Sequence, residues 1–139
     1  MNVVVDTNVL VSALIKPSGI PAQLLTHVVP FTLVTSEEIL AELHRVLHYP
    51  RLQRRYGLSE ELINTYLNLL RAESQVVQVT HDAQGVSQDP DDDKFLACAA
   101  TAHVDYLVSG DPHLTRLKRY QGIPILTPRL FLAVLQTGQ

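Results

Sequence analysis

The sequence alternates between apolar runs of strand length and longer segments in which apolar residues recur at helical spacing. This alternation predicts an α/β protein with a parallel sheet, because parallel neighbours must be joined by crossover segments, which are usually helices. We expect strands at 3–5, 31–35, 75–79, 105–110 and 124–126. Helices are expected from Thr7 and over about 21–28, 37–48, 60–73, 92–103 and 128–136, with a polar break at 49–57 and a loop at 81–91.

The composition fits a single domain over residues 1–139, because a 15.5 kDa chain that is 46% hydrophobic can build one core. Cys98 is the only cysteine, which excludes an intramolecular disulfide and a thiolate metal cluster and suits a reducing compartment. The first 15 residues carry no basic region and are interrupted by Asp6, so neither a signal peptide nor a membrane span is expected. These features predict a cytoplasmic protein without membrane association.

Two acidic residues follow predicted strands at positions that a parallel sheet brings together. Asp6 ends the first predicted strand, and Asp111 lies just beyond the fourth. Ligands of such sheets bind beyond the carboxyl ends of the strands, so both side chains are expected at one edge. Taken alone, Asp6 could equally be the N-cap of the helix that begins at Thr7.

Helical periodicity adds further acids to this edge. On the helix at 37–48, which Ser36 is predicted to cap, Glu42 lies just outside the apolar stripe, so its stem can be buried while its carboxylate reaches a cleft. On the helix at 92–103, Asp92 lies near the centre of the inward face and Asp93 at its margin. The helix dipole also favours acids at a helix start, which is the plainer explanation for this pair. Asp89 and Asp91 are expected to be turn and cap residues.

Four carboxylates in one pocket require compensation. Two such charges about 4 Å apart repel each other by roughly 4 kcal/mol at an effective dielectric near 20. Either one or two of the carboxyls are protonated, or a divalent cation is bound. A set of oxygen ligands favours Mg²⁺ or Mn²⁺ over zinc, and one or two such ions with bound water would support phosphodiester hydrolysis.

Four segments, in this order, resemble the PIN-domain family, and within it the toxin components of toxin–antitoxin systems: VVVDTNVLVSALI, SEEILAELHRVL, DPDDDKFLACAA and DYLVSGDPHL. The resemblance covers nearly the whole chain. It implies a three-layer α/β/α sandwich with a central parallel sheet of four to five strands. It also implies a Mg²⁺- or Mn²⁺-dependent endoribonuclease acting on single-stranded RNA, with an antitoxin as partner.

The resemblance also implies roles for individual residues. The catalytic and metal-ligating roles fall on Asp6, Glu42, Asp111 and one of the pair Asp92 and Asp93. The spacing found in many members selects Asp93, whereas the D-x-D-D-[DN]-x-F-L variant, which this sequence follows, selects Asp92. The helical wheel also favours Asp92. Hydrogen bonds that support the site are expected from Thr7 or Asn8 and from Ser109.

The net charge of −3 argues against a nucleic-acid partner, but the basic residues are clustered. One stretch can hold RNA through phosphate contacts and base stacking, or can form a solvated loop; it contains Arg45, Arg51, Arg54 and Arg55, with Tyr49 and Tyr56. A second candidate lip follows Asp111 and contains Arg116, Lys118 and Arg119.

The histidines near these stretches give weaker signals. His44 and His48 lack the Glu of H-E-x-x-H and lie opposite the apolar stripe, so a solvated or RNA-facing position is expected rather than a zinc site. His113 is expected in a surface turn, although it is close enough to Asp111 to contact a phosphate.

Three other functions are weighed against the nuclease. A haloacid-dehalogenase-type phosphatase needs D-x-D-x-T, and Asn8 stands where the second Asp is required. A receiver domain needs an Asp after its third strand and a Lys near its fifth, where the chain offers Asp82 and Arg129. A non-catalytic RNA-binding module would not need all four acids. The apolar segment at 130–135 could pack on the core, in a homodimer or on an antitoxin.

Overall fold

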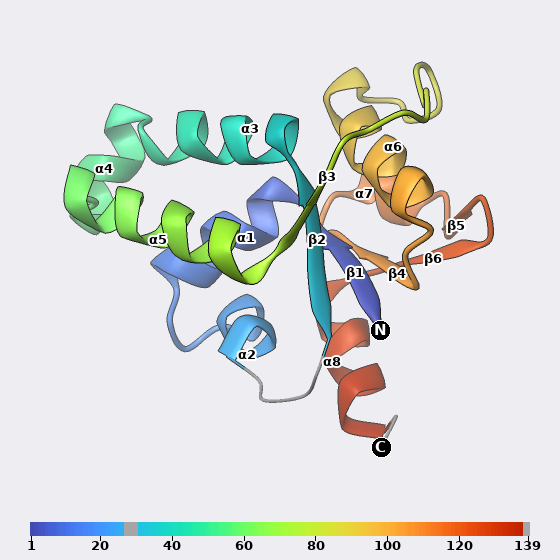
Figure 1. Ribbon diagram of the computed structural model, residues 1–139. Coiled ribbons are helices and arrows are strands. Elements are labelled where there is room, and N and C mark those ends of the chain that lie inside the picture. The colour runs from blue at the N-terminus through green and yellow to red at the C-terminus, as the bar shows by residue number, and fades with distance from the viewer. Residues whose placement is uncertain (27–30, 138–139) are drawn as a thin grey trace.

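Six strands form one sheet in the order β3-β2-β1-β4-β6-β5 in the computed structural model, which describes residues 1–26 and 31–137 (Figure 1). The strands are β1 (Asn2–Val5), β2 (Thr32–Ser36), β3 (Gln75–Val77), β4 (Tyr106–Val108), β5 (Arg119–Tyr120) and β6 (Ile123–Leu126). Neighbouring strands pair in parallel from β3 to β6, and β5 pairs antiparallel with β6. The predicted α/β class with a mostly parallel sheet is confirmed.

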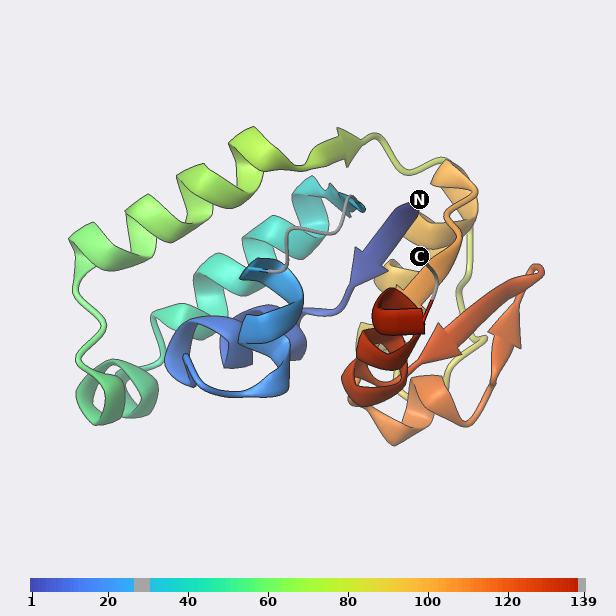
Figure 2. The same ribbon diagram turned by 90° about the horizontal axis from the view of Figure 1, so that it is seen from below.

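Helices cover both faces of this sheet. They are α1 (Thr7–Ile15), α2 (Ile20–Thr26), α3 (Glu37–Leu47), α4 (Pro50–Tyr56), α5 (Glu60–Glu73), α6 (Asp93–Ala102), α7 (Pro112–Thr115) and α8 (Pro128–Thr137), with a 3₁₀ turn at Pro90–Asp92. Figure 1 shows α3, α4 and α5 on one side of the sheet and α6 on the other, and Figure 2 shows α2 beside α8. All three valines of β1 are buried because both faces are covered, as the predicted three-layer sandwich requires.

The strand order places a crevice at the carboxyl end of β1. The chain runs from β1 outward to β3, and then crosses over through α6 to β4 on the opposite side of β1. Ligand sites of open α/β sheets lie at such a reversal of strand order. Val5 pairs with Val108, and the Asp6 amide donates to the Val108 carbonyl at 3.0 Å, so Asp6 and Ser109 leave neighbouring strands side by side.

The helix starts follow local sequence signals. Ser36 accepts a hydrogen bond from the Ile39 amide at 3.3 Å, and Ser59 accepts one from the Leu62 amide at 3.0 Å, so both predicted N-caps are confirmed. α5 occupies the predicted range. The predicted helix at 21–28 corresponds to α2, and its last two residues lie outside the described part of the chain.

The polar stretch at 49–57 was predicted to break the helical pattern, and this prediction is wrong. It forms α4, which begins at Pro50 and ends at Gly57, a residue with a positive φ of 63°. No residue of α4 is fully buried. Leu52 and Tyr56, one turn apart, are partly buried against the core, and two such residues are too few to show helical periodicity in the sequence.

The sheet has six strands rather than the four to five predicted, because β5 was missed. β5 and β6 form a hairpin whose turn residues, Gln121 and Gly122, both have positive φ (52° and 78°), as a type I′ turn requires. A strand of two residues is too short to show alternation. The four-residue helix α7 and the three-residue 3₁₀ turn are also short and were not predicted.

The C-terminal helix α8 packs its apolar side on the sheet. Phe131 is fully buried, with its ring 5.4 Å from that of Phe31, whereas Leu130 is 54% exposed. Among the described helices, none is by itself long and apolar enough to cross a membrane; by length and composition alone the pair α1 and α2 would qualify, with a bend of 92° between them.

Candidate functional site

Asp6 lies directly after β1 and is the N-cap of α1. Its carboxylate accepts hydrogen bonds from the Val9 amide at 2.9 Å and from the Ser109 hydroxyl. Burial raises the pKa of Asp6 to about 6, against the lowering effect of these two hydrogen bonds, and the negative charge of Asp111 adds to the rise. Asp6 is therefore a helix cap and, at the same time, a buried acid at the edge of the sheet.

Ser109 joins the end of β4 to the end of β1. Its side chain is fully buried, and its oxygen donates to Asp6 while accepting from the Asp111 amide at 2.9 Å. Asp111 is the N-cap of α7, with a 2.9 Å hydrogen bond from the His113 amide. Hydrogen bonding to Asp92 is the main cause that lowers the pKa of Asp111.

Asp92 is the acid of this group whose negative charge is most disfavoured by its surroundings. The residue is only 7% exposed, and its Oδ2 atom has no hydrogen-bond partner within residues 1–26 and 31–137. Burial is the first cause that raises the pKa of Asp92 to about 8, followed by the effects of Asp111, Asp89 and Asp6. A buried carboxylate oxygen without a donor calls for a proton or a cation.

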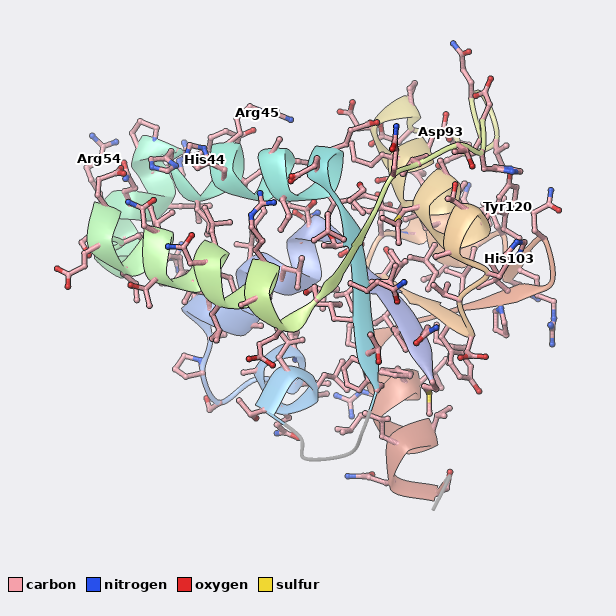
Figure 3. All side chains as sticks on the ribbon, in the orientation of Figure 1. His44, Arg45, Arg54, Asp93, His103 and Tyr120 are labelled. Atoms are coloured by element: carbon pink, nitrogen blue, oxygen red, sulfur yellow. The ribbon has the colours of Figure 1, made fainter. Side chains whose placement is uncertain are left out.

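Asp93 points to a different part of the chain. Its two carboxylate oxygens accept hydrogen bonds from the Gly85 amide at 2.9 Å and the Ser87 amide at 3.0 Å. Figure 3 shows the labelled Asp93 beside the loop that precedes α6. Both oxygens of Asp93 are thus engaged in holding this loop.

Glu42 reaches the site from α3. Its side chain is 16% exposed; one oxygen accepts a hydrogen bond from the Thr7 hydroxyl and the other lies 2.8 Å from the ammonium of Lys94. Of the three residues expected to support the site, Thr7 and Ser109 donate hydrogen bonds to acids. Asn8 is exposed and lines an open hollow of about 480 Å³ together with Asp111.

Two further residues belong to this cluster and were not predicted as ligands. Asp89, Asp92, Asp111 and His113 can each offer one ligand atom, and these atoms lie within 4.8 Å of one another. Asp89 also accepts a hydrogen bond from the Asp91 amide at 3.0 Å, as the predicted turn and cap role requires. The sequence alone does not show whether Asp89 caps a turn or binds a metal ion. The set of carboxylate oxygens and one imidazole, with the unpaired Asp92 oxygen, fits a divalent cation.

A family model described as the PIN domain matches residues 2–113. This chain belongs to the PIN domain family. A relative from Methanocaldococcus jannaschii, the uncharacterized protein MJ1680, is 34% identical over 122 residues, which cover 85% of this chain and 76% of the relative.

Solved structures share the fold of this PIN domain. VapBC-1 from nontypeable Haemophilus influenzae aligns with a TM-score of 0.64 and 16% identity, over 93% of this chain and 99% of that chain. VapC20 of Mycobacterium tuberculosis, described as a toxin that cleaves the sarcin–ricin loop, aligns with a TM-score of 0.56 and 17% identity, over 88% and 98%. At these identities the likeness establishes the architecture.

The predicted basic stretch lies on the outer surface of α3 and α4 of the PIN domain. Four arginines are exposed and form no ion pair with a described acid: Arg45, Arg51, Arg54 and Arg55. Figure 3 shows Arg45 and Arg54 at the α4 end of this surface, pointing outward. The Arg55 guanidinium lies 5.4 Å from the centre of the Tyr56 ring, and Tyr49 is 50% exposed. Exposed cations and the ring of Tyr49 are therefore available on this surface, whereas Tyr56 is partly buried against the core.

His48, at the end of α3, contacts the first residue of α5 in the PIN domain. His48 lies 2.7 Å from Glu60 and 2.6 Å from the His44 carbonyl oxygen. The His44 carbonyl, and next Glu60, raise the pKa of His48. A solvated or RNA-facing position was expected for both histidines; for His48 the structure shows instead a partner on α5.

The residues of the second candidate lip, Arg116, Lys118 and Arg119, do not form one common surface; two of them contact different segments. Arg116 donates to the Gln88 side chain at 3.1 Å, which joins the end of α7 to the loop before the 3₁₀ turn. Arg119 donates to the Gly122 carbonyl at 3.4 Å within the hairpin, and Lys118 has a positive φ of 62°. Arg116 is the member of this lip that contacts a segment bordering the acids.

Proposed function

We propose that this PIN domain is an endoribonuclease that uses Mg²⁺ or Mn²⁺ to hydrolyse phosphodiester bonds of single-stranded RNA. The observation that supports this most directly is the buried, unpaired oxygen of Asp92, in a residue whose carboxylate lies within 4.8 Å of ligand atoms of Asp89 and Asp111 and is affected by the charge of Asp6. A divalent cation held by Asp6, Asp92 and Asp111 would relieve the repulsion among them. Asp93 is left out of this set because its oxygens hold the loop.

The residues around the acids fix their geometry for this task. When bound, the cation would supply a water molecule of lowered pKa and stabilise the charge of the leaving oxygen. Ser109 orients Asp6, and Thr7 orients Glu42, which adds the fourth negative charge from α3. Asp92 would exchange its proton for the cation, since its raised pKa leaves it largely protonated at neutral pH without one.

The basic surface on α3 and α4 supports a path for the RNA. Because Glu42 lies on α3 itself, a strand that follows this helix leads from the arginines to the acids. Exposed arginines would bind phosphates, and Tyr49 and Tyr56 would offer stacking surfaces, which suits an unpaired strand better than a duplex. We assign Arg45, Arg51, Arg54 and Arg55 to this path.

We further propose that the chain is the toxin of a toxin–antitoxin pair, acting in the cytoplasm. Its solved fold neighbours include VapBC-1 and the toxin VapC20, which favours an antitoxin as the protein partner. The homodimer considered from the sequence stays a prediction.

The decisive experiment measures cleavage of a labelled single-stranded RNA pool with Mn²⁺, with EDTA, and with Asp92→Asn. Asp91→Asn is the matched control, because Asp91 is the exposed neighbour of Asp92. We expect cleavage by the unaltered chain and the control, and none with EDTA or Asp92→Asn. Cleavage that persists with EDTA would refute the metal mechanism. RNA binding without cleavage under all conditions would favour the non-catalytic module, and phosphate release from a small phosphate ester would favour the phosphatase.

A further inference from the structure

The ammonium group of Lys94 is built into the acidic site. Its Nζ atom lies 2.8 Å from a Glu42 oxygen and donates to the Asp91 carbonyl at 2.6 Å. The Lys94 and Glu42 side chains are each only 16% exposed. Lys94 stands in the first turn of α6, and Nζ lies 5.3 Å from the centre of the Phe95 ring. These contacts hold the positive charge of Lys94 in one position between α3 and α6.

The four acids of the site differ in what compensates them. Glu42 is fully engaged, since Thr7 holds one of its oxygens and Lys94 the other. Asp6 accepts hydrogen bonds from two neutral donors, the Val9 amide and the Ser109 hydroxyl. The Asp111 Oδ1 atom lies 3.6 Å from the Nδ1 atom of His113, and Asp92 has an unpaired oxygen within the described chain. The charge of Glu42 is therefore matched by Lys94, whereas among the described residues no lysine or arginine forms an ion pair with Asp6, Asp92 or Asp111.

A second divalent ion at Glu42 would either displace the Lys94 ammonium or bind close to it. Two positive charges in ion-pair range of the same carboxylate repel each other strongly in a partly buried site. Lysine also carries a compact charge that cannot act as a ligand while it is protonated.

We propose that Lys94 is a positioning residue that takes the place of a second metal ion, so that the site binds one divalent cation at Asp6, Asp92 and Asp111. This inference rests on the metal site of the proposed function. It assigns Glu42 and Lys94 together to a fixed ion pair that borders the single ion.

The test is a titration with Mn²⁺ alone, without RNA, followed by calorimetry for stoichiometry and by electron paramagnetic resonance for coupling between neighbouring ions. Four variants accompany the unaltered chain: Lys94→Met, Lys94→Arg, Lys94→Met combined with Glu42→Gln, and Lys16→Met as an exposed control. Thermal unfolding shows which variants are folded. We expect one ion per chain in the unaltered protein, in Lys16→Met and in Lys94→Arg.

In Lys94→Met we expect either a second ion, spin-coupled to the first, or first-ion affinity increased about tenfold by the loss of one nearby positive charge. Glu42→Gln in the same chain should cancel the second ion. Two coupled ions in the unaltered protein, or a folded Lys94→Met that titrates as the unaltered protein does, would overturn the role of Lys94 alone. A chain that binds no Mn²⁺ would overturn the metal site and this inference with it.

Discussion

Ser109 donates a hydrogen bond to Asp6 across 103 positions of sequence, and the two residues meet because β4 and β1 are neighbours in the sheet. The same oxygen accepts from the Asp111 amide. One hydroxyl thus sets the orientation of an acid on each side of the crevice. Removal of a residue that orients a metal ligand in this way typically costs about 10- to 100-fold in metal affinity.

Ser109→Ala should weaken Mn²⁺ binding by about 10- to 100-fold, because Asp6 loses its orienting donor. The folded chain should also lose about 1–3 kcal/mol of stability, since the Asp111 amide is left without its acceptor. Calorimetric titration and chemical unfolding measure the two effects. Ser18→Ala, at an exposed position, is the control and should change neither. An unchanged Mn²⁺ affinity in Ser109→Ala would contradict the orienting role.

Asp92→Asn should abolish metal-dependent cleavage and yet stabilise the metal-free chain. Asparagine is neutral at every pH, so it removes the free-energy cost of a buried carboxyl whose charged form three other aspartates oppose, and its amide can donate to Asp111. We expect the melting temperature in EDTA to rise by about 3 °C or more, the size of shift that roughly 1 kcal/mol gives in a chain of this length. Differential scanning calorimetry in EDTA is the measurement. A fall in melting temperature would show that the negative charge of Asp92 is compensated within the protein.

The stability of the metal-free chain should fall as the pH rises. The folded pKa of Asp92 is about 8 and that of Asp6 about 6, both above the ordinary value of 3.8, so the folded chain binds protons more tightly than the unfolded chain does. The stabilisation is complete below about pH 4 and is lost as the pH passes through 6 and then 8. Saturating Mn²⁺ should flatten this dependence, because the cation replaces the protons. Melting temperatures across this range, with EDTA and with Mn²⁺, test the point; a flat profile in EDTA would count against it.

Much of the fold could be predicted because its signals are local. Three buried valines define β1, and Ser36 and Ser59 mark helix starts through their hydroxyl oxygens. The helix α4 was missed because Leu52 and Tyr56 are too few apolar residues to show helical periodicity, and β5 because two residues cannot show alternation. Short elements that depend on their surroundings leave no periodic pattern.

The site was predicted only as far as strand ends and helix faces determine it. Asp6 and Asp111 follow strands that must be near each other in a parallel sheet, and Glu42 borders an apolar stripe. The contact of Lys94 with Glu42 joins residues 52 positions apart on two helices, and their crossing is a property of the packed structure. The sequence has no corresponding signal.

Asp93→Ala should loosen the loop before α6 and leave the ion site largely intact. The Gly85 and Ser87 amides would lose their acceptor, so their hydrogen exchange should accelerate. Mn²⁺ affinity should change by less than about threefold, whereas loss of a direct ligand, as in Asp92→Asn, should cost more than the roughly 10- to 100-fold typical of an orienting partner. Equal losses of affinity in the two variants would assign Asp93 to the ion. Exchange mass spectrometry and calorimetry on the same samples separate the two effects.

Removal of an arginine from the α3–α4 surface should weaken RNA binding through its salt dependence. Each phosphate contact with a single strand contributes about 0.7 to the slope of log affinity against log salt, so Arg54→Ala should lower the slope by about that amount if Arg54 binds one phosphate. The Asp92→Asn background allows binding to be measured without cleavage. Arg129→Ala, an exposed arginine on α8, is the matched control. Arg45→Ala and Arg54→Ala should act additively, because the two arginines lie on different helices and would bind different phosphates. Equal effects of Arg54→Ala and Arg129→Ala would remove α4 from the RNA path.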